Sequence, residues 1–197
     1  RLSTLRMETN GKKIYAVISY APQSSAPQSH LTAFQDQLES LLSAARPDEI
    51  TLAPGDYNAR LGRANGVCGN DGKDGQNEVG EHLVDMFAMH GLYSPLTFRA
   101  QKYEGSWWHP VTHTSHQPDH FLVSMQHRHM VNKCFNDMMP VESDHMCVKL
   151  HLDLGKPLQL RRTRTNRSKR LRLDFKQMKL ESVVDKFRGY MPPPPPP

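Results

Sequence analysis

Three short acidic motifs hold the residues of this chain that could do chemistry. They are Gly55-Asp56-Tyr57-Asn58, Asp119, and Ser143-Asp144-His145. Carboxylate and amide oxygens bind hard divalent cations, a carboxylate can orient or deprotonate water, and an imidazole can stabilise developing negative charge. Hydrolysis of a phosphodiester needs these three roles together. Each motif taken alone is more typical of a tight turn, because Gly, Asp and Asn all favour turns.

Apolar segments beside these motifs predict strands that start or end at the acidic residues. Residues 50–53 predict a short buried strand that Pro54-Gly55 ends, so that Asp56 and Asn58 project into a loop. Residues 120–123 predict a second strand after Asp119. Pro118 puts that strand at risk, because proline has no backbone donor. Apolar residues alternate after His145 and predict a half-buried strand: Met146, Val148, Leu150 and Leu152.

Strands and helices alternate in the first half of the chain. Residues 13–20 predict a strand. Apolar residues at helical spacing predict a helix over 31–42, which Arg46-Pro47 ends. Val79, Leu83, Met86 and Phe87 predict a second helix, and Gly91 suits its C-terminal cap. This alternation predicts an α/β fold.

The order and spacing of the motifs resemble the endonuclease/exonuclease/phosphatase superfamily. Within it, the chain resembles the endonuclease domain of LINE-type retrotransposons and the related craniofacial development protein 2-like proteins. The resemblance spans residues 1–155 and implies a partial four-layer α/β sandwich. It is carried by Ile18-Ser19-Tyr20-Ala21-Pro22, residues 55–62, 77–82 and 90–92, Thr97-Phe98, Trp107-Trp108-His109-Pro110, residues 119–123, and Ser143-Asp144-His145.

The resemblance implies a role for the residues around the first motif. Asp56 would orient or deprotonate the attacking water, and Asn58 would hold the scissile phosphate. Tyr20 matches a tyrosine of the family that lies near the phosphate. These residues would form the part of the active site that handles water and substrate.

The resemblance also implies how charge is managed. His145 would contact the phosphate, Asp119 would hydrogen-bond behind it to fix its orientation, and Asp144 would help to bind Mg²⁺. In the family, an Asn and a metal-binding Glu precede the Tyr-Ala-Pro passage, whereas this chain starts at Arg1, a few residues before that strand. We therefore expect Mg²⁺ to be bound weakly or not at all, and hydrolysis to be impaired.

The C-terminal region differs in composition from the rest. Residues 156–190 contain twelve Lys or Arg against three Asp or Glu, so the basic character of the chain, which is +5 in total, resides there. We expect a basic linker with a possible helix over 156–190 and an extended polyproline tail over 191–197. The cations that could contact phosphates are Arg161, Arg162, Arg164, Arg167, Lys169 and Arg170. A solvated linker explains the same run equally well.

Three hypotheses remain open at this point. The chain could be a Mg²⁺-dependent DNA endonuclease-like phosphodiesterase, or a catalytically inactive scaffold in a larger assembly, whose protein partner covers a sheet face that would otherwise be an apolar patch. It could also bind nucleic acid through the basic segment. No membrane partner is expected, because no apolar stretch approaches a spanning length. With no signal peptide and three unpaired cysteines, we expect a nuclear or cytoplasmic protein that is not secreted.

Overall fold

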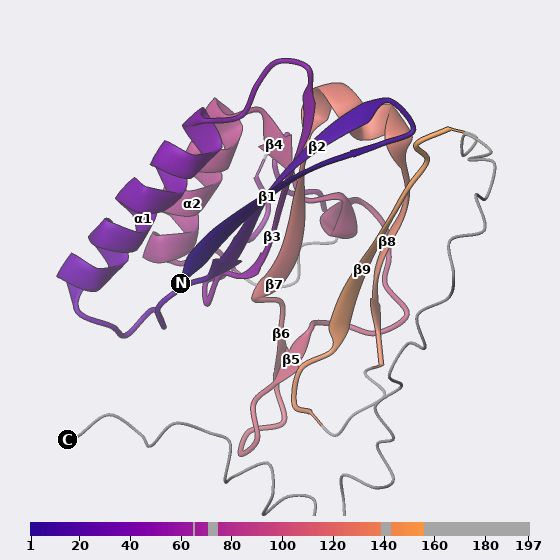
Figure 1. Ribbon diagram of the computed structural model, residues 1–197. Helices are drawn as coiled ribbons and strands as arrows, with labels where there is room; N and C mark the ends of the chain where they lie inside the picture. Colours follow the sequence, from indigo (N-terminus) through magenta and orange to yellow (C-terminus); the bar gives the residue numbers. More distant parts are fainter. Residues whose placement is uncertain (65, 71–74, 139–142, 156–197) are drawn as a thin grey trace, which may run out of the picture. The chain divides into compact units, whose positions relative to one another are not determined.

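A computed structural model describes residues 1–64, 66–70, 75–138 and 143–155 (Figure 1). These residues belong to the unit Arg1–Leu158. The predicted basic linker and polyproline tail lie outside the described residues. So do the predicted phosphate-binding cations Arg161, Arg162, Arg164, Arg167, Lys169 and Arg170.

A mixed five-stranded sheet organises this unit (Figure 1). Its spatial order is β1-β2-β3-β7-β4, with β1 Leu2–Thr9, β2 Lys12–Tyr20, β3 Glu49–Asp56, β7 Asp119–Ser124 and β4 Leu92–Tyr93. β2 and β3 are parallel, whereas β7 is antiparallel to both of its neighbours, β3 and β4. The middle of the sheet therefore joins segments that are far apart in the sequence.

Strand β1 had not been predicted. It pairs with β2 through a two-residue turn, so that Thr9 lies opposite Lys12. The turn residues Asn10 and Gly11 have φ angles of 52° and 70°. Asn-Gly is the usual sequence of a hairpin turn with two positive φ angles, because both residues tolerate the left-handed conformation. The turn chemistry explains why the first nine residues add an edge strand to the sheet.

Two helices, α1 (Gln28–Ser43) and α2 (Glu78–Met89), lie side by side against one face of the sheet (Figure 1). Both were predicted from apolar spacing. Asn77 caps α2 by accepting a 3.0 Å hydrogen bond from the backbone N of Gly80. The buried side chains of the two helices pack against the face of the sheet that they cover. The resulting core includes Tyr15, Val17, Phe34, Leu38, Tyr57, Leu83, Phe87 and Leu122.

Two further strand pairs lie on the side of the sheet away from the helices (Figure 1). Strands β8 (Val131–Asp137) and β9 (Cys147–Leu152) form an antiparallel ladder, and β9 contains most of the predicted alternating segment. Strands β5 (Trp107–Trp108) and β6 (Ser115–His116) form a short hairpin. Two short 3₁₀ helices are present among the described residues: η1 (Pro95–Phe98) follows β4, and η2 (Met125–Met130) follows β7.

Two expectations about prolines were wrong. Strand β3 does not end at Pro54-Gly55 but continues to Asp56, because Gly55 lets the backbone of β2 approach closely. A Cβ on Gly55 would lie 2.4 Å from the carbonyl oxygen of Ser19. Pro118 does not disrupt the strand after it, because β7 begins one residue later and the proline contributes its carbonyl, which accepts a 2.9 Å hydrogen bond from Tyr57 N.

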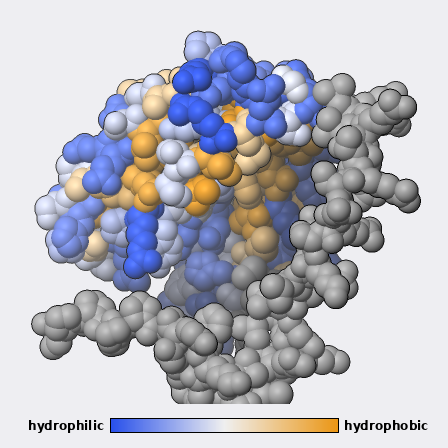
Figure 2. Space-filling view, viewed as in Figure 1, coloured by the Kyte–Doolittle hydropathy of each residue, from blue (hydrophilic) through white to orange (hydrophobic). Residues whose placement is uncertain are grey.

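The outer face of the β1–β2 hairpin exposes apolar side chains. Leu5, Met7 and Ile18 are 46%, 43% and 46% exposed. They share one face, because Leu5 pairs with Ala16, Met7 with Ile14, and Ile18 with Ser3. The space-filling view shows apolar residues gathered over the strands between the helices and the β8–β9 ladder (Figure 2). Within the described residues, no helix is long and apolar enough to cross a membrane.

Candidate active site

Three predicted residues lie in one row across the end of the sheet. Tyr20 pairs with Asp56 between β2 and β3, and Asp56 pairs with Asp119 between β3 and β7. Two carboxylates in directly opposite positions repel each other unless a proton, a hydrogen-bond donor or a cation compensates. The register of three strands, which come from distant parts of the sequence, therefore creates a site of concentrated negative charge.

A hollow of about 470 Å³ opens over this row. Its lining includes Tyr20, Asp56 and Asp119 from the sheet and Ser143 and His145 from the segment before β9. Tyr20 is 57% exposed. The hollow therefore gathers residues of all three acidic motifs next to a solvent-accessible aromatic ring.

Asp119 and His145 form a hydrogen-bonded pair in this hollow. His145 Nδ1 lies 2.9 Å from Asp119 Oδ2, and Ser106 Oγ donates a 2.7 Å hydrogen bond to the same carboxylate oxygen. An ionised carboxylate accepts hydrogen bonds and does not donate them, so this contact places the proton of a neutral imidazole on Nδ1 and leaves Nε2 free to face a ligand. Burial raises the pKa of Asp119, and its hydrogen bonds to Ser106 and His145 oppose that rise.

Ser106 holds this pair in place, and it was not among the predicted site residues. Its side chain is fully buried. Besides donating to Asp119, Ser106 Oγ accepts a 3.2 Å hydrogen bond from Asp119 N, and its carbonyl accepts a 2.6 Å bond from Met146 N. It therefore ties β7 to the residue that follows His145. A lone serine has no spacing or charge pattern that a sequence could reveal, apart from its place before Trp107.

Asp144 lies next to the pair but is turned toward the β5–β6 hairpin. Its Oδ2 accepts a 2.9 Å hydrogen bond from Trp107 Nε1, and its carbonyl accepts a 3.2 Å bond from Trp108 N. The hydrogen bond from Trp107 holds the pKa of Asp144 below its usual range. Trp107 also forms a β-bridge with His145. In this arrangement Asp144 fixes the hairpin against the segment that carries His145.

Asn58 braces the loop after β3. Its backbone N donates a 2.9 Å hydrogen bond to Asp56 Oδ1, and its Nδ2 donates a 2.9 Å bond to the carbonyl of Ala21. The residue adopts a φ of 46°, in the left-handed region that Asn tolerates better than most residues. One amide hydrogen of Nδ2 is used by Ala21, so the second hydrogen and Oδ1 could contact a ligand.

A cation site can be built from three of these residues. One ligand atom each from Asp56, Asp119 and His145 lie within 4.8 Å of one another. Two carboxylates and an imidazole suit a divalent cation, and the imidazole favours first-row transition metals such as Mn²⁺ more than Mg²⁺. The donor set therefore fits the expected kind of cofactor. Asp144 is not part of this group, although the resemblance implies that it binds metal.

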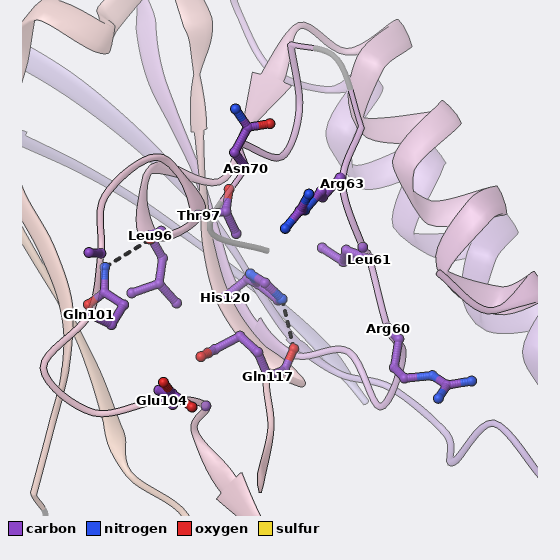
Figure 3. Close-up of a pocket in the computed structure, with 13 residues that line it drawn as sticks. Arg60, Leu61, Arg63, Asn70, Leu96, Thr97, Gln101, Glu104, Gln117 and His120 are labelled. Atoms are coloured by element: carbon purple, nitrogen blue, oxygen red, sulfur yellow. Dashed lines mark hydrogen bonds between the residues drawn. The ribbon is translucent and has the colours of Figure 1, made fainter. Parts of the chain in front are cut away.

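A separate hollow of about 330 Å³ lies near His120 (Figure 3). Arg60 and Arg63 lie along one side of it and Glu104 on the other. His120 is buried in β7, with Nδ1 2.9 Å from Ser94 Oγ and Nε2 2.9 Å from the Gln117 carbonyl. These contacts hold the strand from which Asp119 projects. Asp56, Asp119 and His145, which could bind a cation, line the other hollow, of about 470 Å³.

No protein-family model and no curated protein matches the chain. Solved structures do match its fold. The endonuclease domain of TRAS1, a telomere-specific non-LTR retrotransposon, superposes with a TM-score of 0.58 at 14% identity and covers 79% of this chain. An AP endonuclease from Archaeoglobus fulgidus gives a TM-score of 0.56 at 16% identity over 77% of the chain. The 3'-5' exonuclease NExo from Neisseria meningitidis gives 0.52 at 14% identity over 71%.

The chain spans 64%, 65% and 61% of the length of these three proteins. At such low identity the likeness concerns the fold. The chain therefore shares the fold of these solved nucleases, and the predicted α/β class is confirmed.

Proposed function

We propose that this chain hydrolyses phosphodiester bonds in DNA with a divalent cation bound by Asp56, Asp119 and His145. The observation that carries the proposal is the convergence of these three side chains in one hollow at the end of the sheet. The fold supports it, because the similar solved structures include two endonucleases and an exonuclease. Within this fold we place the chain with the LINE-type retrotransposon endonucleases and craniofacial development protein 2-like proteins, on the sequence passages that resemble them.

The proposed chemistry divides among residues that line the hollow and Asn58, which is hydrogen-bonded to one of them. Asp56 orients or deprotonates the attacking water, since its carboxylate has one oxygen fixed by Asn58 N. His145, held by Asp119 through Nδ1–H, would offer Nε2 to the cation, and the cation would stabilise the growing negative charge of the phosphate. Tyr20 and the second amide hydrogen of Asn58 position the phosphate.

A bound divalent cation supplies Lewis-acid stabilisation of the phosphate. Mg²⁺ is the cofactor that the resemblance implies, and three protein ligands without a further carboxylate favour weak binding of this ion. We therefore propose slow, metal-dependent hydrolysis. Asp144 contributes by fixing Trp107 and thereby the segment of His145.

The test is nicking of supercoiled plasmid by the full chain with Mg²⁺, with Mn²⁺ and with EDTA. Metal-dependent nicking should be lost in Asp56→Ala and His145→Ala. Lys102→Ala is a suitable control, because Lys102 lies over the ring of Tyr103 and outside the hollow. Nicking that persists in both site variants would identify a contaminating nuclease and contradict the proposal.

A second candidate function is a catalytically inactive scaffold. The exposed apolar residues Leu5, Met7 and Ile18 favour it, because an apolar strand face of this kind commonly binds another protein. A scaffold would show no nicking above Asp56→Ala under any metal condition. It would retain partner binding in Asp56→Ala and lose it in a Leu5→Ser, Met7→Ser double variant.

Nucleic-acid binding through the basic segment is compatible with either function. The proposal is that the cations between Arg161 and Arg170 bind phosphates without regard to sequence. Affinity should then fall steeply with salt. Deletion of residues 161–170 should abolish this binding. If the deletion variant still binds DNA with the same salt dependence, the binding belongs to the folded unit.

A further inference from the structure

A third hollow, distinct from the active-site hollow and from the one near His120, lies beside strand β4. It has a volume of about 420 Å³, which is within the range of small-molecule sites. Its lining includes three cations, Arg99, Arg128 and Lys133, and two aromatic residues, Tyr93 and Phe98. We call it the basic aromatic pocket. Its lining shares no residue with the active-site hollow.

The fold separates this pocket from the active site. Tyr93 pairs with Val123 near the end of β7, and Asp119 begins the same strand. Four residues of extended chain span about 13 Å. Lys133 lies in β8, whose opposite end pairs with Cys147 near His145. The two sites therefore lie toward opposite ends of the same strands.

Within the part of the chain that the structure describes, the cations of the pocket have no acidic partners. Among the described residues, no Asp or Glu lines the pocket, and neither Arg128 nor Lys133 forms an ion pair. Arg99 Nη1 donates a 3.4 Å hydrogen bond to the carbonyl of Asn132 and keeps its other donors. Three neighbouring positive charges repel one another, so this site favours an anion with several acceptor oxygens.

The aromatic residues add a second kind of surface. Tyr93 is buried, and the Phe98 ring meets it edge to face at 5.8 Å between centroids. Phe98 is 47% exposed, so its ring remains available to a planar ligand. Burial raises the pKa of Tyr93, and the charges of Arg128 and Arg99 oppose that rise.

We propose that the basic aromatic pocket binds a nucleotide, with its phosphate on Arg99, Arg128 and Lys133 and its base against Phe98. Phosphate offers the acceptor oxygens that these cations need, and every nucleobase has a flat face that stacks on an aromatic ring. The nucleotide is either free or one unit of a single strand. The proposal is independent of hydrolysis, because no residue of the active-site hollow takes part.

The test measures binding to the full chain in EDTA, so that no hydrolysis occurs. Deoxyadenosine monophosphate, inorganic phosphate and deoxyadenosine are titrated separately by calorimetry and by amide chemical shifts. We expect the monophosphate to bind at least tenfold tighter than either part alone. Arg128→Ala and Lys133→Ala should each weaken its binding about tenfold. Phe98→Ala should also weaken the binding of the monophosphate nucleotide about tenfold, but it should leave the binding of inorganic phosphate unchanged.

Two controls separate this site from general electrostatics and from catalysis. Lys102→Ala removes one positive charge outside the pocket, and Asp56→Ala disables the proposed active site, so both should bind the nucleotide like the wild type. All variants are checked for native circular dichroism. Equal weakening by Lys102→Ala and Arg128→Ala, or no saturable binding of the monophosphate, would overturn the proposal.

A short thymidine oligonucleotide distinguishes the two sources of the nucleotide. If a strand is the natural ligand, the oligonucleotide binds more tightly than the monophosphate, and Arg128→Ala removes that advantage. If a free nucleotide is the ligand, Arg128→Ala weakens the monophosphate alone. Binding of a phosphotyrosine peptide in preference to both would assign the pocket to a protein partner and contradict the proposal.

Discussion

The cation site predicts that substitution of Asp56 removes stabilisation by a divalent cation, whereas substitution of Asp144 does not. Asp56 has a ligand atom within 4.8 Å of those of Asp119 and His145, whereas Asp144 accepts its hydrogen bond from Trp107 outside this group. Asp56→Asn should therefore remove most of the stabilisation by a divalent cation, whereas Asp144→Asn should leave most of it. Both changes remove one negative charge and keep the side-chain shape, so each is the matched control of the other.

The expected size of the effect follows from mass action. A cation at a hundred times its Kd stabilises the folded state by about 2.7 kcal/mol. For a chain of 197 residues, 1 kcal/mol shifts Tm by about 2–4 °C, so the wild type should gain about 5–10 °C. If Asp56→Asn lowers affinity a hundredfold, the same concentration equals Kd and gives about 0.4 kcal/mol, or about 1–2 °C.

Without cation, the order of the melting temperatures of the wild type and Asp56→Asn should reverse. Asp56 lies directly opposite Asp119, and opposite like charges destabilise a strand pair. Asp56→Asn should therefore melt at the wild-type temperature or slightly above it in EDTA, which a purely structural loss would not produce.

Scanning calorimetry with Mn²⁺ titrated into each protein measures all of these values. Mn²⁺ is the better probe because an imidazole takes part. Equal gains in Tm for the wild type and Asp56→Asn would refute the site. Loss of the gain in Asp144→Asn alone would move the cation to Asp144, as the resemblance implies.

Further predictions concern the surroundings of the site. Ser106→Ala should lower the free energy of unfolding by about 1–3 kcal/mol in urea titrations, because it removes the hydrogen bond to the charged carboxylate of Asp119. The nicking rate should fall as well. An unchanged nicking rate would show that Ser106 does not position Asp119 for catalysis. Gly55→Ala should destabilise the fold by about 1–3 kcal/mol, since its Cβ would meet the Ser19 carbonyl at 2.4 Å, and a stable variant would show that β2 and β3 can separate freely. Burial raises the pKa of Asp119, so the folded state holds this proton more tightly than the unfolded chain. Without cation, the wild type should lose stability relative to Asp119→Asn as the pH rises above about 4 through the raised pKa, and urea titrations from pH 4 to 7 measure this difference.

Local patterns determined much of the fold. Apolar residues at helical spacing located both helices, and alternation or short apolar runs located β2, β3, β7 and β9. These patterns are short in range, because helical and strand periodicity depends on neighbours in the sequence. The expected strand end at Pro54-Gly55 was wrong because the close approach of Ser19, a distant residue, decides what that glycine does.

The sequence by itself also determined which acids could do chemistry, through their types and their places beside apolar segments. Only the tertiary structure decided that Asp56 lies opposite Asp119, that Ser106, just before β5, donates a hydrogen bond to Asp119 in β7, and that Asp144 faces Trp107. Strand register and hairpin docking join residues far apart in the chain, and a serine or tryptophan partner leaves no periodic signal. The chemical groups are therefore encoded locally, whereas their contacts result from long-range pairing of the strands.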